Sequence, residues 1–169
     1  MKNNRIKDQH KAQTTTKTNR FQIAVAATPD IKDGYTHGLR ALGAYSSKIK
    51  LPSHKKCDGS VDIDAHTEAR HANSSRWDYC FGVNDEIYFV EVHPAYTGEV
   101  NTVIRKLQWL KTWLSTAAPQ LNALRVKSRH PFYWIQSNGF HITKTSSQYR
   151  LAIQNKLKPV AVLDLTSDE

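Results

Sequence analysis

The chain has 169 residues, of which 39% are hydrophobic, so it suits one folded domain rather than a wholly disordered segment. Its formal net charge is +9, and residues 1–20 supply +5 of that charge through six Lys or Arg against one Asp. No apolar run approaches the roughly 20 residues that a bilayer-spanning helix needs, which argues against a membrane protein.

The chain is expected to divide into two parts. Residues 1–20 are polar and basic, and they predict a flexible arm that is either a solvated terminus or a phosphate-seeking segment. Residues 21–169 form a single α/β domain in this interpretation. The apolar run at 21–27 is too short, and too far behind a charged stretch, for a signal peptide. A cytoplasmic protein with Cys57 and Cys80 as reduced thiols is therefore expected.

The first half of that domain opens with a predicted helix over 28–47. Thr28 is a good N-cap, and Pro29 suits the first helical position. An apolar face then recurs every three or four residues, although Gly34, Gly38 and Gly43 weaken it. Residues 48–59 are predicted to form a loop. Residues 60–66 are predicted to form either a short strand or the segment that leads into a helical turn at 67–72.

The second half alternates strands and helices. Residues 76–95 predict a hairpin, and the apolar stripe over 100–114 predicts a helix that ends before Pro119. The run at 130–143 predicts a strand before a tight turn at Asn138 and Gly139, and so either a strand or a hairpin. A helix from Ser146 to about Leu157 and a strand at 159–165 follow. This order favours an α/β fold with a mixed central β-sheet flanked by helices.

The hairpin carries two acids that call for an explanation. If Asn84 and Asp85 form its turn, Asp78 lies directly opposite Glu91. Cβ atoms so placed are about 4.5–5.5 Å apart, where like charges repel, and a Mg²⁺ ion would remove the conflict. His93 shares the face of Glu91 because side chains alternate along a strand. The alternative is that both acids lie near strand ends and face water.

A first helix, a hairpin with Asp on one strand and Glu-x-base on the next, and a following amphipathic helix resemble the PD-(D/E)XK nuclease superfamily. The resemblance implies a restriction endonuclease-like core. It assigns Asp78 and Glu91 as metal ligands, His93 to the position where most members have Lys, and Glu68 as an additional acid ahead of the hairpin.

The resemblance further implies Mg²⁺- or Mn²⁺-dependent cleavage of nucleic acid, more often DNA than RNA, by a possible homodimer. His93 would serve as the base, or a lysine would come from the neighbouring helix. On a helical wheel Lys111 lies within the apolar stripe and Lys106 on its flank, so either could reach inward. Arg76, Lys106 and Lys111 would hold the phosphate backbone without reading sequence.

Three other interpretations stay open. The acids and histidines between Asp62 and His71 could bind a metal, although their spacing favours surface polar residues. Trp109, opposite the apolar stripe, could stack on a single strand, although burial between layers is favoured. The chain could also be a non-catalytic nucleic-acid-binding module, or a protein-interaction domain whose charge only confers solubility.

Overall fold

A four-stranded mixed sheet forms the centre of the molecule. The computed structural model describes residues 18–167. The strand order is β2-β3-β4-β5, antiparallel between the first three strands and parallel between β4 and β5. The strands are β2 (Cys57–Asp62), β3 (Tyr79–Val83), β4 (Glu86–Tyr96) and β5 (Phe132–His141). The predicted α/β class with a mixed sheet is therefore confirmed.

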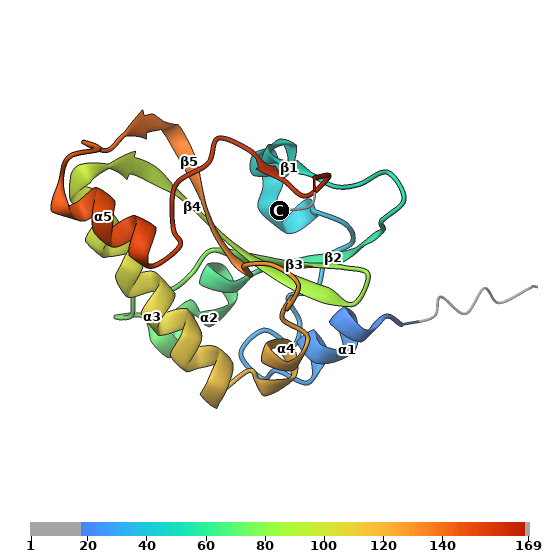
Figure 1. Cartoon of the computed structure of the whole chain (residues 1–169). Helices are drawn as coiled ribbons and strands as arrows, with labels where there is room; N and C mark the ends of the chain where they lie inside the picture. Colours follow the sequence, from blue (N-terminus) through green and yellow to red (C-terminus); the bar gives the residue numbers. More distant parts are fainter. Residues whose placement is uncertain (1–17, 168–169) are drawn as a thin grey trace, which may run out of the picture.

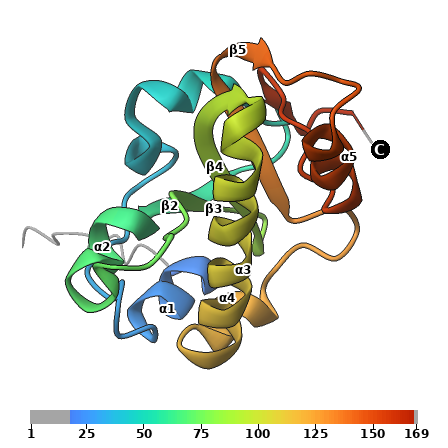
Figure 2. The ribbon, with the colours of Figure 1, turned by 90° about the vertical axis from the view of Figure 1, so that its left-hand side faces the viewer.

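Helices cover one face of this sheet, and α3 crosses it lengthwise (Figures 1 and 2). They are α1 (Arg20–Ala26), α2 (Ile63–His71), α3 (Val100–Thr116), α4 (Pro119–Ala123) and α5 (Ser147–Gln154), with a 3₁₀ turn η2 (Thr97–Glu99) before α3. The other face is covered by η1 (Arg40–Lys48) and by a small parallel pair, β1 (Ile49–Lys50) with β6 (Leu163–Asp164). Each face has its own apolar core.

Alternation along β4 divides its side chains between the two cores. Ile87 and Phe89 pack in the core beneath the helices, while Tyr88 and Val90 pack in the core on the η1 face. Such a strand is buried on both faces, so it is almost continuously apolar. Glu91 continues the alternation of Ile87 and Phe89 and therefore points to the helical face.

The β3–β4 hairpin has the register that the sequence predicts. Val83 pairs with Glu86, and Tyr79 pairs with Val90. Asn84 and Asp85 both have positive φ angles, of 50° and 66°, as a two-residue type I′ turn requires. β3 begins at Tyr79, so Asp78 lies one residue before the paired region, next to Glu91.

Two predicted helices are confirmed with small changes at their ends. α3 buries the stripe of apolar residues from Val100 to Leu114. In α5 the side chain of Ser146 accepts a hydrogen bond from the backbone N–H of Tyr149, which is the expected N-cap. α5 ends at Gln154, shortly before the predicted end, and Lys156 follows it with a φ of 55°.

The predicted helix at 28–47 is wrong. Residues 27–33 form successive turns and a bend, and η1 begins only at Arg40. Gly38 and Gly43 have positive φ angles of 58° and 54°, which no α-helix can contain. The predicted loop at 48–59 contains β1 and the start of β2, because backbone pairing outweighs the local signals of Pro52 and the basic cluster.

α1 was not predicted, and it moves the start of the domain. Asn19 caps it by accepting a hydrogen bond from the N–H of Gln22, so the first described helix begins at Arg20, before the predicted start at residue 21. Residues 1–17 of the predicted basic arm lie outside the described residues. Phe21 anchors α1 in the main core with no exposed surface.

Asn138 and Gly139 do not make the predicted tight turn. They lie inside β5, where the pairing with β4 shifts from His93–Gln136 to Ala95–Phe140. The extra residues of β5 form a bulge, and Gly139 supplies its positive φ of 84°. The parallel partnership with β4 thus overrides a local turn signal.

None of the helices within residues 18–167 is both long and apolar enough to span a membrane. The cytoplasmic location inferred from the sequence stays a prediction.

Gly82→Ala should destabilise the domain because β3 passes close under α1. A Cβ at Gly82 would lie 2.8 Å from Cγ and 2.9 Å from Cβ of Phe21, neither of which is the free end of a side chain. Overpacking of this kind costs about 1–3 kcal/mol. Urea unfolding should show a lower midpoint with an unchanged slope. Gly98→Ala, where no atom lies within 4 Å, is the matched control; equal midpoints for both variants would contradict the packing described.

Candidate functional site

Three charged side chains from three segments meet on the helical face of the sheet. Lys106 of α3 places its Nζ atom 3.0 Å from Oδ1 of Asp78. The same Nζ atom also donates a hydrogen bond to Oε1 of Glu91 on β4. Asp78 comes from the segment that enters β3, so one ammonium group joins two carboxylates that are 13 residues apart in the sequence.

Backbone hydrogen bonds fix both carboxylates. The N–H of Asp78 donates to Oε2 of Glu91 at 3.1 Å, and the N–H of Val92 donates to Oδ2 of Asp78 at 2.9 Å. The first turn of α2 also holds the main chain, because the N–H groups of Ile63 and Asp64 lie 2.7 and 3.3 Å from the carbonyl oxygen of Asp78. The acids are thus positioned by the sheet end and a helix start, independently of Lys106.

Burial makes it energetically costly to keep these three side chains charged. Glu91 has no exposed surface, whereas the side chains of Asp78 and Lys106 are 18% and 17% exposed. Burial and the nearby charge of Asp78 raise the pKa of Glu91 well above its ordinary value, although Lys106 offsets part of this rise. Burial by itself lowers the pKa of Lys106, but the charges of Glu91 and Asp78 outweigh it and raise that pKa. The lysine therefore stays a cation.

His93 lies beside the triad formed by Asp78, Glu91 and Lys106. Its side chain forms a hydrogen bond with a residue that the sequence analysis did not identify. Its Nδ1 atom is 3.6 Å from Oε1 of Glu91, and its Nε2 atom is 2.7 Å from Oε2 of Glu99 in η2. With Nε2 donating to Glu99, Nδ1 faces the triad. Glu99 lies outside any strand or helix periodicity, so no sequence pattern pointed to it.

Asp62 is a third acid near the pair; the sequence placed it only in the alternative cluster between Asp62 and His71, not beside Asp78 and Glu91. It precedes α2 and accepts a hydrogen bond from the N–H of Ala65 at 2.8 Å, as an N-cap. β-sheet register pairs it with Tyr79, the neighbour of Asp78. Burial, followed by the charges of Asp64 and Asp78, raises its pKa. A correct reading of 60–66 as strand followed by helix could have found it.

The remaining predicted site residues are not brought into the triad. Glu68 lies on α2 with an exposed side chain and forms no hydrogen bond or ion pair within the described part of the chain. The guanidinium of Arg76 pairs with Asp64 at 2.8 Å and donates to two carbonyl oxygens at the end of α2. Lys111 lies over the ring of Phe132, away from the acids.

The polar cluster after Asp62 serves local structure, as favoured from its spacing. His66 Nδ1 lies 2.8 Å from the carbonyl oxygen of Asp62, and His71 Nε2 lies 3.0 Å from Oδ2 of Asp30. Among residues 18–167, no group of three or more His, Cys, Asp or Glu is arranged to hold a metal ion. Trp109 packs against Trp113 and His71 rather than standing free for base stacking.

The two carboxylates of the triad could nevertheless hold a hard cation. Mg²⁺ prefers oxygen ligands, often takes only one or two carboxylates from a protein, and keeps several waters. Asp78 and Glu91 offer such oxygens side by side, and Lys106 neutralises only one of their two negative charges. The partial exposure of Asp78 gives the approach. The donor set therefore fits Mg²⁺ or Mn²⁺.

Lys106→Met should destabilise the protein, because it leaves Glu91 buried without its cation. Loss of one partner of a buried ion pair costs about 3 kcal/mol or more. When the pKa of a carboxyl group is higher in the folded protein than in the unfolded chain, the free energy of unfolding falls as the pH rises above the unfolded pKa, near 4.5. The loss should therefore grow between pH 5 and pH 8 in urea unfolding measured with EDTA present.

Two further variants complete this test. The double variant Lys106→Met with Glu91→Gln should recover most of the lost stability at pH 8, because the fully buried carboxylate is gone and the remaining charge, on Asp78, is partly exposed and accepts the N–H of Val92. Arg105→Met, on the exposed side of the same helix, should change the free energy of unfolding by no more than about 0.5 kcal/mol. A Lys106→Met variant whose loss is independent of pH would contradict the charge pairing.

Comparison with protein-family models, with curated proteins and with solved structures gave no match.

Proposed function

We propose that the protein hydrolyses phosphodiester bonds of nucleic acid with the help of a divalent metal ion, and that its substrate is DNA in the first instance. One observation carries the proposal: Lys106 of α3 converges on Asp78 and Glu91 of the hairpin. A PD-(D/E)XK nuclease needs two acids and a basic residue at one point. The resemblance allowed that base to come from the neighbouring helix.

The order of the elements also supports the proposal. A helix, a three-stranded antiparallel meander, a long helix and a strand parallel to the Glu-bearing strand follow one another as α1, β2, β3, β4, α3 and β5. This order agrees with a restriction endonuclease-like core. The helix α2, inserted between β2 and β3, places Asp62 rather than Glu68 beside the acids.

Each residue has a role that its position suits. Asp78 and Glu91 would hold the metal, which when bound polarises the phosphate and lowers the pKa of a coordinated water. Lys106 reaches both acids, so it can orient the attacking water and stabilise negative charge on the phosphate. His93 presents Nδ1 beside Glu91 and can accept a proton, with Glu99 holding its other nitrogen.

The reaction itself needs no further reactant. Water supplies a hydroxyl group to phosphorus, the bond from phosphorus to one ester oxygen breaks, and the leaving oxygen takes up a proton. The products are a phosphate monoester and a free hydroxyl end. A fully buried Glu91 excludes bulk water from one side of the site, so the substrate must approach from the side of Asp78.

A non-catalytic nucleic-acid-binding module is the second candidate. Lys106 bonds directly to both carboxylates, so the triad can also be a self-contained buried ion network that only supports the fold. The two candidates differ in whether the acids matter for bond cleavage. Homodimer formation, which cutting both strands would favour, stays a prediction.

Cleavage of plasmid, single-stranded DNA and RNA by the full chain should require Mg²⁺ or Mn²⁺ and stop in EDTA. Asp78→Asn, Glu91→Gln and Lys106→Met should each lower the single-turnover rate by roughly 10²-fold or more, since each removes a metal ligand or the positioning cation. His93→Gln should lower it less if Lys106 positions the water.

Glu86→Gln is the matched control, because it removes a carboxylate from the far end of the same strand. It should cut at the wild-type rate. Folded variants that bind DNA normally, with no cutting by the wild-type protein under any metal, would favour the binding module. Cutting that survives in both Asp78→Asn and Glu91→Gln would exclude this site as the centre of hydrolysis.

A further inference from the structure

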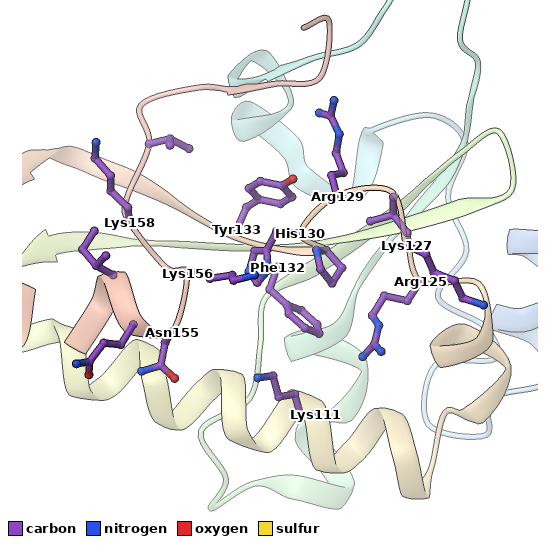
Figure 3. A pocket seen from close by; sticks show the side chains of 15 residues that line it. Lys111, Arg125, Lys127, Arg129, His130, Phe132, Tyr133, Asn155, Lys156 and Lys158 are labelled. Carbon is purple, nitrogen blue, oxygen red and sulfur yellow. The ribbon is translucent and has the colours of Figure 1, made fainter. Parts of the chain in front are cut away.

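A second charged feature lies on the opposite flank of α3. An open cavity of about 1190 Å³ is formed between α3, the segment 125–133 that leads into β5, and residues 153–160 at and after the end of α5. Six cationic side chains line it: Lys111, Arg125, Lys127, Arg129, Lys156 and Lys158 (Figure 3). Within the described residues no Asp or Glu lines it.

This basic cavity concentrates the positive charge of the domain. After the first 20 residues the chain has 18 Lys and Arg against 14 Asp and Glu, a net charge of +4. Two of those acids, Asp168 and Glu169, lie outside the described residues, whereas Arg20 belongs to α1, so residues 18–167 have a net charge of +7. Six of these positive charges line the cavity, and the rest of the described chain is close to neutral. The charge is therefore gathered in one place rather than spread for solubility. A concave surface lined by one sign of charge attracts ligands of the other sign.

The cations of the cavity lack acidic partners in the described part of the chain. None of the six forms an ion pair with an Asp or Glu among residues 18–167. Lys111 Nζ and Arg125 Cζ both lie 5.7 Å from the ring centroid of Phe132, so two like charges share one aromatic ring. Bound anionic groups would relieve this repulsion.

Backbone geometry holds one of these lysines at the cavity. Lys156 closes α5 with a φ of 55°, a conformation that glycine adopts far more easily, and its N–H donates to the carbonyl oxygen of Ile153. Figure 3 shows Lys111, Arg125 and Lys156 gathered around Phe132 from three separate segments. The convergence therefore depends on the tertiary fold and not on a basic run in the sequence.

We propose that this basic cavity binds the phosphate backbone of a nucleic acid at a point away from the bond that is cut. The choice of nucleic acid as the anion rests on the proposed function. Phe132 is only 4% exposed beneath its two cations, so it offers no platform for a base. The contact is therefore with phosphates and carries no sequence preference.

The cavity and the triad cannot hold the same phosphate. Lys106 and Lys111 are five residues apart on α3, which turns them about 140° from each other around the helix axis. Figure 2 shows α2 on one side of α3 and α5 on the other. The triad faces the α2 side, where Asp78 meets the first turn of that helix, and the cavity faces α5. The cavity thus serves as an anchor that extends the contact with the substrate.

The test measures binding without cleavage. Fluorescence anisotropy of a labelled duplex oligonucleotide and of its single strand is followed in EDTA, with the full chain, over a series of KCl concentrations. The triple variant Lys111→Gln, Arg125→Gln, Lys156→Gln should bind the duplex at least tenfold more weakly at about 0.1 M salt. Its salt dependence should fall by about 2–3 in the slope of log K against log salt.

A second triple variant, Lys32→Gln, Arg40→Gln, Lys56→Gln, removes the same charge from exposed residues that do not line the cavity. It should weaken binding by no more than about twofold. Equal weakening in both triple variants, or no binding by the wild-type protein, would overturn the proposal. The proposal would also be overturned if the cavity variant lost binding only to anionic vesicles or polyglutamate and still bound the oligonucleotides as the wild type does.

The same measurement separates this proposal from the hydrolysis. Because binding is measured in EDTA, where the metal-dependent hydrolysis does not run, a change in binding reports on the cavity and not on cleavage. If the wild-type protein never cuts but the cavity variant still loses binding, the cavity stands and the chain is a binding module. If cutting is found but the cavity variant binds normally, the cavity proposal fails and the hydrolysis stands.

Discussion

The arrangement of the site depends on one fully buried carboxylate, that of Glu91. Glu91 sits at the middle of a strand whose other side chains are almost all apolar, so its charge must be matched from within the protein. The match comes from the N–H of Asp78 and from Lys106, but a second carboxylate lies in the same place. An apolar side chain at Glu91 would pack without any of these costs. Two acids and one lysine at this point are therefore a costly arrangement for structure alone, which favours the proposed chemical role.

Helix α3 connects this site to the rest of the molecule. Its apolar face closes the main core, one flank supplies Lys106 to the triad, and the other flank supplies Lys111 to the basic cavity. One rigid helix thus fixes the spacing between a proposed reaction centre and a proposed anchor for the phosphate backbone. Rigid elements hold such spacings more accurately than loops do. In this account the substrate lies across α3 rather than against a single pocket.

The sequence predicted the parts of the site that depend on local rules. Turn chemistry at Asn84 and Asp85 fixed the register of Asp78 against Glu91, and the helical period placed Lys106 on the flank of a buried stripe. It could not predict Glu99 or the basic cavity, because their positions depend on how separate segments pack. It failed at 28–47 because the apolar spacing suggested a helix that Gly38 and Gly43 interrupt with positive φ angles.

The central claim is that Asp78 and Glu91 form a site for a divalent cation, and titration of the folded protein with Mn²⁺ tests it most directly. Isothermal titration calorimetry should show one or two ions bound by the wild-type protein, with binding lost in Asp78→Asn and Glu91→Gln and kept in Glu86→Gln. No binding by the wild-type protein, or binding that both site variants retain, would contradict the account and leave the triad as a buried ion network of the fold.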